Sequence, residues 1–177
     1  MKRQNGFSIT ELMVVMGIVA ILLAIGVPSF RYVTNANRMS AEANGLLGDL
    51  MFARGEAIKQ GLPVLVCTSV DGATCAGTTT WEAGWITCVD TNANGTCGSL
   101  LRVQKSFVSS KDTLRPDAAS NSNLISFGRE GFASGIAAGA TFTLHDSSSN
   151  SVWTRCLQIT AIGMLSVTNH VSNAACI

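Results

Sequence analysis

A short polar leader, residues 1–6, is followed by a run of apolar residues in which one side chain is charged. The run covers residues 7–28, and Glu11 is the only charged residue between Phe7 and Val27. Its length matches the roughly 20 residues that cross the hydrocarbon core of a bilayer as a helix. The pattern therefore predicts a membrane helix that begins directly after the leader.

Glu11 needs a positively charged partner, because a carboxylate in hydrocarbon costs at least about 2.5 kcal/mol. No lysine, arginine or histidine lies between Phe7 and Val27, so the side chains of this helix cannot supply one. Cleavage between Gly6 and Phe7 would create a charged amine about one helical turn from Glu11. Between neighbouring helices the same two charges would set a stagger, so the arrangement indicates a helix that assembles with others.

An ordinary secretory signal peptide or a plain membrane anchor is the simpler interpretation of such a run. A secretory signal is cut after its apolar stretch, at an Ala-x-Ala-like site. Here the chain instead continues from Ala24 through Pro28 into a second helical pattern. We therefore favour a retained helix, with a kink near residues 24–28 because Pro28 lacks an amide hydrogen.

Residues 29–61 have the pattern of an amphipathic helix. Seven residues fall on one helical face at the spacing i, i+3, i+4, i+7, namely Ala43, Leu46, Leu47, Leu50, Arg54, Ala57 and Ile58. Gly61 and Pro63 mark the end of this helix. If residues 7–60 are helical throughout, they extend about 80 Å, with the first half in lipid and the second half packed on a globular domain.

From residue 62 onward the pattern changes to short β-rich segments separated by clusters of Gly, Ser, Asn and Thr, which predicts strands joined by turns. The expected strands are residues 62–67, 85–90, 100–108, 124–127, 140–144, 152–159 and 164–168. The predicted fold class is α+β, with a long N-terminal helix packed on a mainly antiparallel sheet. The sheet belongs to one β-rich globular domain over residues 62–177.

All six cysteines fall in this predicted globular domain. An even number in an exported domain indicates disulfides formed in an oxidising compartment, with fifteen formal pairings. Metal binding is the weaker interpretation, because the chain has no Cys-x-x-Cys and only two histidines, His145 and His170. Proximity along the chain favours Cys67 with Cys75, Cys88 with Cys97, and Cys156 with Cys176.

Length and charge fit one membrane helix and one globular domain, since the chain has 177 residues and a formal net charge of +1. Loss of Lys2 and Arg3 with the leader leaves 10 of the 12 basic side chains against 11 acidic ones. These two leader charges also fit the positive-inside bias. We therefore expect the leader in the cytoplasm and the globular domain on the periplasmic side of the inner membrane.

Catalytic chemistry is not indicated, because the chain has no nucleophile motif, no Gly-rich phosphate loop and no catalytic pair of carboxylates. Residues 90–95 match the opening of an EF-hand loop, but Leu101 stands where that loop has its bidentate glutamate, so we interpret them as a hairpin turn. Three tryptophans fit a core better than a binding surface: Trp81, Trp85 and Trp153. We predict no enzyme activity, no cofactor and no metal site.

The segment Gly6-Phe7-Ser8-Ile9-Thr10-Glu11-Leu12, followed by an apolar helix, resembles the class III signal of type IV pilins and type II secretion pseudopilins. Residues 53–58, and residues 81–86 leading to residues 90–95, resemble the GspH/FimT group of minor pilins and minor pseudopilins. Together these motifs touch most of the chain.

This resemblance implies a pilin-like fold and a prepilin peptidase that cuts after Gly6 and methylates the new amine of Phe7. It also implies that Glu11 pairs with the N-terminus of an adjacent subunit. The leading expectation is a minor pilin of a type IV pilus that lies at or near the tip and primes assembly with other minor and major pilins. A minor pseudopilin of a type II secretion system is the first alternative.

The second alternative is a DNA-binding pilus component for natural transformation. Some members of the group bind DNA through arginines in a Gly-Arg-x-Arg-like stretch near the C-terminus. The corresponding residues 162–167 keep the glycine but lack the arginines, and no lysine or arginine follows Arg155. Neutralisation of phosphates supplies most of the affinity for DNA. This alternative therefore needs a basic patch assembled by folding from Lys105, Lys111, Arg115 and Arg129.

Overall fold

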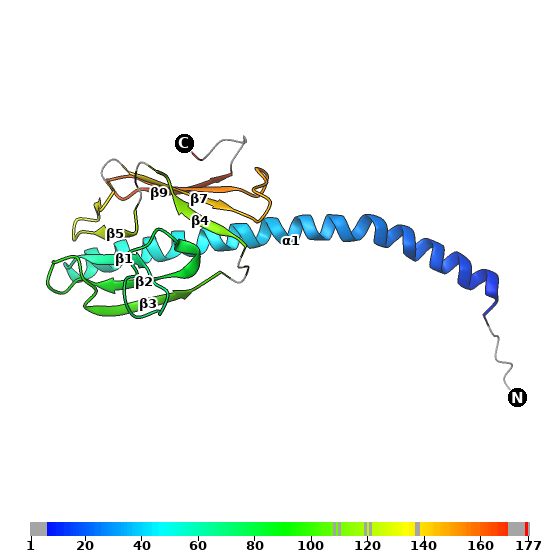
Figure 1. Ribbon diagram of the computed structural model, residues 1–177, viewed down its shortest axis with the longest axis horizontal. Helices are drawn as coiled ribbons and strands as arrows, with labels where there is room; N and C mark the ends of the chain where they lie inside the picture. Colours follow the sequence, from blue (N-terminus) through cyan, green and yellow to red (C-terminus); the bar gives the residue numbers. More distant parts are fainter. Residues whose placement is uncertain are drawn as a thin grey trace, which may run out of the picture. The chain divides into compact units, whose positions relative to one another are not determined.

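The computed structural model describes residues 7–107, 109, 111–118, 120, 122–136, 139–169 and 176 (Figure 1). The chain divides into two units, residues 1–37 and residues 38–177. The helix α1 (Ile9–Gln60) begins in the first unit and continues into the second. It remains helical through Pro28, so the sequence pattern on both sides of this proline outweighs the one hydrogen bond that it removes.

The C-terminal half of α1 buries one face and ends where the sequence predicts. Its buried residues are Met39, Ala43, Leu46, Leu50, Ala53 and Ala57. Ile58 is 54% exposed, although it shares the predicted spacing, because it lies on the flank of this buried stripe. The main chain of Gly61 adopts a φ of +68°, and its N–H donates to the carbonyl of Ala57 at 3.0 Å. Glycine at this position closes the helix without the steric cost of a side chain.

The second unit contains two sheets in which all strand pairs are antiparallel. The first sheet has the order β3 (Ser99–Lys105), β2 (Gly84–Val89), β1 (Val64–Thr68), β5 (Leu124–Phe127), β6 (Ala133–Ser134). The second has the order β4 (Thr113–Pro116), β7 (Ala140–His145), β8 (Arg155–Ile159), β9 (Leu165–Asn169). A 3-10 turn, η1 (Trp81–Ala83), precedes β2. The expected α+β class is confirmed, with two sheets in place of one.

The two sheets pack against the C-terminal half of α1 and enclose one core with it (Figure 1). Trp81 and Phe142 bring the sheets together, with ring centroids 5.2 Å apart in an edge-to-face arrangement. Trp85 lies edge to face with Phe107 at 6.1 Å. Such aromatic pairs stabilise a core beyond the area that they bury. The tryptophans at 81 and 85 therefore serve packing, as the sequence indicated.

A second, smaller apolar cluster lies on the other side of the first sheet. Leu65 pairs with Cys88 and Cys67 with Ile86, so these four side chains share one face. Trp85 occupies the alternate face, where α1 packs. All four residues are at most 1% exposed. The sheet therefore buries residues on both faces, which explains why β1 and β2 read as nearly continuous apolar runs.

Two disulfide-closed loops cover this second cluster. One loop is closed by Cys67 and Cys75, the other by Cys88 and Cys97. Residues 73–75 of the first loop and residues 95–97 of the second line one shared pocket, so the loops meet over the sheet. The third disulfide joins Cys156 of β8 to Cys176. These are the three pairs that proximity along the chain favours.

Candidate functional site

The first turn of α1 is held by Ser8. The Ser8 hydroxyl accepts a hydrogen bond from the main-chain N–H of Glu11 at 3.2 Å, and the Ser8 carbonyl accepts one from that of Leu12 at 3.1 Å. Serine at a helix start satisfies amide groups that have no partner in the helix. The carboxylate of Glu11 thus stands in the first turn, where the helix dipole favours a negative charge.

The apolar part of α1 is exposed along its length. Residues 7–34 are all exposed, and Phe7 reaches 77%. The helix is long and apolar enough to cross a membrane, and none of its most apolar 18-residue stretch is buried. Large exposed apolar surfaces on a protein mark sites of contact with other molecules or with lipid. This segment is therefore the first candidate site for assembly or membrane insertion.

Glu11 takes part in no ion pair among the residues that the structure describes. Phe7 is described and Gly6 is not, so the predicted cleavage junction lies partly outside the described residues. The requirement for a cation from another chain, or from a processed N-terminus, remains a prediction.

Ion pairs and hydrogen bonds that the sequence did not indicate attach the second half of α1 to the β-rich part of the chain. Arg38 binds both carboxylate oxygens of Asp112, at 2.8 and 3.1 Å. Asp49 accepts hydrogen bonds from Trp85 of β2 at 2.9 Å and from Arg102 of β3 at 3.1 Å. These partners lie 36 to 74 residues apart in sequence. No local pattern could have paired them.

Glu42 shares this side of α1 with Arg38. Burial, followed by the nearby carboxylate of Asp112, raises the pKa of Glu42 to about 7 and outweighs the opposing effect of Arg38. Both Arg38 and Glu42 line a pocket of about 290 Å³ between α1 and the end of β3, with Trp85 and Phe107 as its aromatic walls. This pocket was not anticipated from the sequence, because α1, β2 and β3 contribute to it together.

The segment at residues 90–95 is a turn closed by its own hydrogen bonds. The two carboxylate oxygens of Asp90 accept the main-chain N–H groups of Asn94 at 3.1 Å and Gly95 at 2.7 Å. Asp90 is 3% exposed. Among the described residues no group of three His, Cys, Asp or Glu side chains could hold a metal ion. The hairpin-turn interpretation accounts for these contacts.

The four basic residues considered for DNA lie on different elements. Lys105 ends β3, Lys111 precedes β4, Arg115 lies in β4 and Arg129 follows β5. Arg115 is paired with Glu82, and Arg129 lies 3.3 Å from Glu130. His145 contacts Thr154 at 3.3 Å, while His170 lies outside the described residues.

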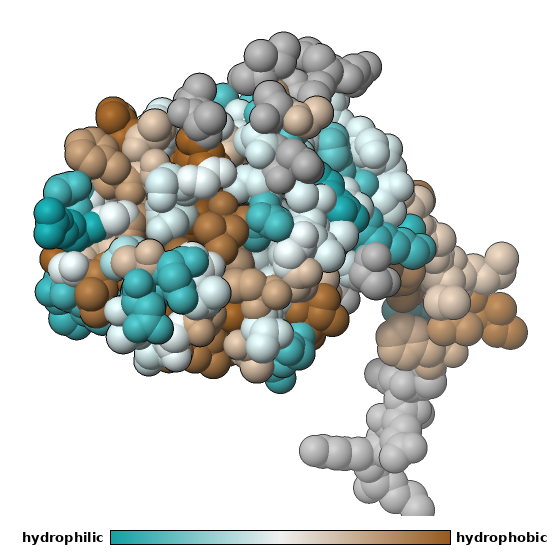
Figure 2. All heavy atoms as spheres, turned by 60° about the vertical axis from the view of Figure 1, so that its left-hand side comes forward, coloured by the Kyte–Doolittle hydropathy of each residue, from teal (hydrophilic) through white to brown (hydrophobic). Residues whose placement is uncertain are grey.

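The surface of the globular unit is mixed. In the view of Figure 2 hydrophobic and hydrophilic residues alternate over it in small patches.

The first half of α1 is apolar and exposed and carries one carboxylate, that of Glu11, while two antiparallel sheets pack on the second half. This arrangement defines a pilin-like protein. The model of the type II transport protein GspH family matches residues 42–163, and that of the prokaryotic N-terminal methylation motif matches residues 1–27. The chain belongs to the GspH family of minor pilins and minor pseudopilins.

Two solved structures show the same fold. The type IV minor pilin FimU of Pseudomonas aeruginosa is 22% identical, with a TM-score of 0.61 over 81% of this chain and 96% of that one. The minor pseudopilin EpsH from the type 2 secretion system of Vibrio cholerae is 12% identical, with a TM-score of 0.54 over 75% and 97%. No curated protein matches the chain. The expected family and pilin-like fold are confirmed.

Proposed function

We propose that this chain is a minor pilin of a type IV pilus, located at or near the tip, where its N-terminal helix helps to initiate assembly. The observation that carries the proposal is the exposed apolar segment of α1, in which Glu11 is the only charged residue up to Val27. An uncompensated carboxylate in an apolar assembly would be costly, so a cation of a neighbouring subunit must accompany it. The likeness to a type IV minor pilin supports the choice of system.

Processing follows from the same segment. A prepilin peptidase cuts between Gly6 and Phe7 and methylates the amine of Phe7, in agreement with the N-terminal methylation motif over residues 1–27. The helix then remains in the inner membrane with the globular unit in the periplasm until the subunit enters the filament. The amine of Phe7 in one subunit and Glu11 of its neighbour form the pair that sets their stagger.

Replacement of Glu11 tests this pairing. Glu11→Gln keeps the size of the side chain and removes its charge, while Glu130→Gln removes a charge from an exposed position outside the apolar segment. We expect Glu11→Gln to lower the number of pili more than about tenfold, because a buried ion pair that loses one partner is strongly destabilised. Electron microscopy counts the pili, and immunoblots check cleavage and amount of the chain. Normal piliation by a correctly cleaved variant would contradict the mechanism.

A type II secretion pseudopilin is the second candidate, favoured by the likeness to EpsH and by the family to which the chain belongs. Deletion of the gene in cells that carry both systems separates the two candidates. Loss of pili with intact protein secretion supports the pilus, whereas the converse supports the secretion system. Neighbouring genes for other minor pilins, or for a secretion operon, give an independent answer.

A further inference from the structure

The strand β3 is a free edge of the first sheet. In the described part of the chain it pairs with β2 only. Six of its seven residues are exposed. A free edge presents main-chain N–H and C=O groups that can pair with the strand of another polypeptide. The register of β3 shows which of these groups are available.

The main-chain groups of Val103 and Lys105 point away from the sheet. Gly84 accepts a hydrogen bond from Ser69 at 2.9 Å, so its main-chain groups are directed toward β1. Alternate residues of a strand face opposite neighbours, so Trp85 is directed toward β3, where it pairs with Gln104. Gln104 is therefore engaged with β2. Val103 and Lys105, the residues on either side of it, direct their main-chain groups outward, where the carbonyl of Lys105 accepts a hydrogen bond from the side-chain amide of Gln104 at 3.3 Å.

A pocket lies on each face of this edge. On the outer face, β3 and the loop at residues 69–72 enclose about 320 Å³ beside Val103 and Lys105. On the α1 face, Trp85 and Phe107 line the pocket of about 290 Å³ described above. Gln104 and Ser106 contribute to both pockets. A strand added to β3 directs successive side chains to opposite faces, so the two pockets can receive neighbouring side chains of one partner strand.

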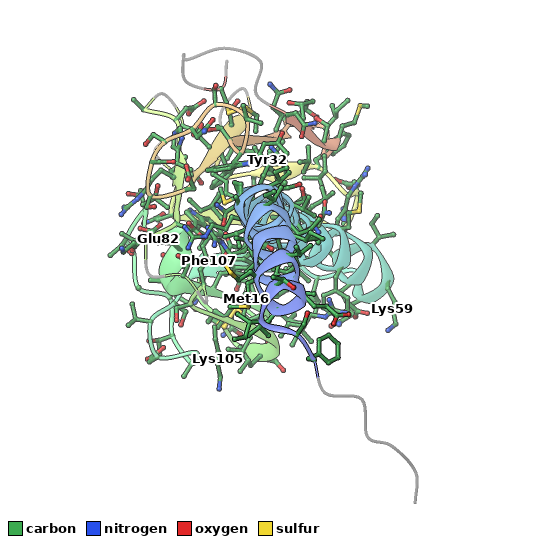
Figure 3. The ribbon with its side chains drawn as sticks, turned by 90° about the vertical axis from the view of Figure 1, so that its right-hand side faces the viewer. Met16, Tyr32, Lys59, Glu82, Lys105 and Phe107 are labelled. Atoms are coloured by element: carbon green, nitrogen blue, oxygen red, sulfur yellow. A yellow bond between two sulfur atoms is a disulfide. The ribbon has the colours of Figure 1, made fainter. Side chains whose placement is uncertain are left out.

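Charge at the edge favours a partner that is not a second copy. Arg102 is compensated by Asp49 at 3.1 Å. Lys105 forms no ion pair with a described residue, and it points away from the globular unit (Figure 3). Pairing two copies of β3 would bring two uncompensated lysines into one strand pair, whereas an acidic residue opposite Lys105 is favourable.

We propose that β3 is a docking strand for an extended segment of a different subunit, with an acidic side chain beside Lys105 and an apolar side chain in the pocket of Trp85 and Phe107. This inference rests on the proposal that the chain enters a filament. The proposed contact is made by the main chain of β3 on the globular unit, and it is separate from the contacts that the apolar helix makes.

A matched pair of substitutions tests the backbone contact. Val103→Pro removes an outward N–H, which an edge strand tolerates, while Val103→Thr keeps both the N–H and the branched shape. In cells that make the filament, we expect Val103→Pro to lower the amount of this chain in purified filaments about fivefold, and Val103→Thr to leave it unchanged. Tryptophan fluorescence of the full chain in detergent checks the fold. Equal amounts of the two folded variants in filaments would overturn the proposal.

If Val103→Pro does not fold, hydrogen exchange of the unaltered chain tests whether β3 pairs with a strand of another subunit. Filaments are compared with the full chain alone in detergent. We expect the amides of Val103 and Lys105 to exchange at least about tenfold more slowly in filaments, with Gln104 protected in both samples. Unchanged exchange at β3 would overturn this inference alone. Absence of the chain from filaments would overturn the proposed function, and the inference with it.

Charge reversal tests the chemistry of the partner. Lys105→Glu should lower incorporation about two- to fivefold, while the same change at the exposed Lys59 should not. Equal incorporation of the two variants would overturn the acidic assignment. A photo-crosslinker at Gln104 should form adducts with an extended segment of another subunit, and adducts between two copies of this chain would overturn the choice of partner.

Discussion

The backbone conformation and the close packing at position 163 require a glycine. Gly163 adopts a φ of +77°, and an added Cβ would overlap the carbonyl oxygen of Gly131. The same carbonyl accepts a hydrogen bond from Arg54 Nε at 3.0 Å. Gly163 therefore lets the turn between β8 and β9 approach the turn after β5, at the point where α1 is also attached. This packing supplies a physical reason for glycine at position 163.

Replacement of Gly163 by Ala should destabilise the chain by more than about 2 kcal/mol, since it combines a strained backbone with a steric overlap. Gly55→Ala is the matched control, because Gly55 lies in α1 with open space around it. We expect that control to stabilise the chain by about 0.5 to 1 kcal/mol through helix propensity. Urea unfolding of the full chain in detergent, followed by tryptophan fluorescence, measures both. Similar effects of the two substitutions would contradict the packing at Gly163.

At the scale of elements, the sequence predicted those segments whose pattern is set locally. The helix and seven of the strands follow from apolar periodicity and turn residues. Thr113–Pro116 was missed because an edge strand with a terminal proline has no apolar alternation. Ala133–Ser134 is too short for any pattern. The position of β3 at the edge could not be predicted either, because strand order is a property of the assembled sheet.

The same limit applies to the candidate sites. Phe7 and Glu11 could be proposed from the sequence because their signal lies within seven consecutive residues. The pockets beside Gln104 combine α1, the loop after β1 and β3, and no spacing in the sequence connects these. Proximity gave the three cysteine pairs, but it gave no indication that two of the loops cover a face of the sheet. That role is visible only through the register of β1 and β2.

The covering role of these loops can be measured. Replacement of Cys88 and Cys97 by serine should cost about 2 to 3 kcal/mol and should increase hydrogen exchange at Leu65 and Ile86, which the loop covers. Replacement of Cys156 and Cys176 by serine removes a disulfide from the second sheet and should leave exchange at Leu65 and Ile86 unchanged. Exchange that rises equally in both double variants would show that the disulfides stabilise the chain without a local covering role.

Across the whole molecule, ionisable groups with opposite shifts set the dependence of stability on pH. Hydrogen bonds from Thr74, Ala73 and Ser69 lower the pKa of Asp71. Burial would raise the pKa of Asp146, but hydrogen bonds from Ser148 and Asn150 outweigh it and the pKa is lowered. Groups of this kind contribute stability above their ordinary pKa of 3.8, and the contribution is lost as the pH falls below it. Asp71 and Asp146 therefore contribute to the loss of stability at acid pH, which is the acid limb of the stability curve.

Glu42 acts in the opposite direction and defines the alkaline limb. Its pKa rises on folding from 4.5 to about 7, so the folded chain binds more protons than the unfolded chain between these values. Stability therefore falls as the pH rises through this window, and the loss is complete above about pH 7. Because Glu42 is only half-buried, solvent screening limits the loss to about 1 kcal/mol. The maximum of stability should therefore lie between about pH 4 and pH 5.

Glu42→Gln should remove this alkaline loss. The variant should unfold at higher urea concentration than the native chain at about pH 8, and the difference should nearly vanish at about pH 4, where Glu42 is protonated in both the folded and the unfolded chain. Glu130→Gln, which removes a charge from the surface, should follow the native curve at both values. Buried Trp81 and Trp85 report unfolding of the globular unit by fluorescence. If the free energy of unfolding of Glu42→Gln depends on pH in the same way as that of the native chain, Glu42 does not cause the loss of stability at alkaline pH. The ionisation of this carboxyl in the pocket beside β3 would then make no contribution to the stability of the fold.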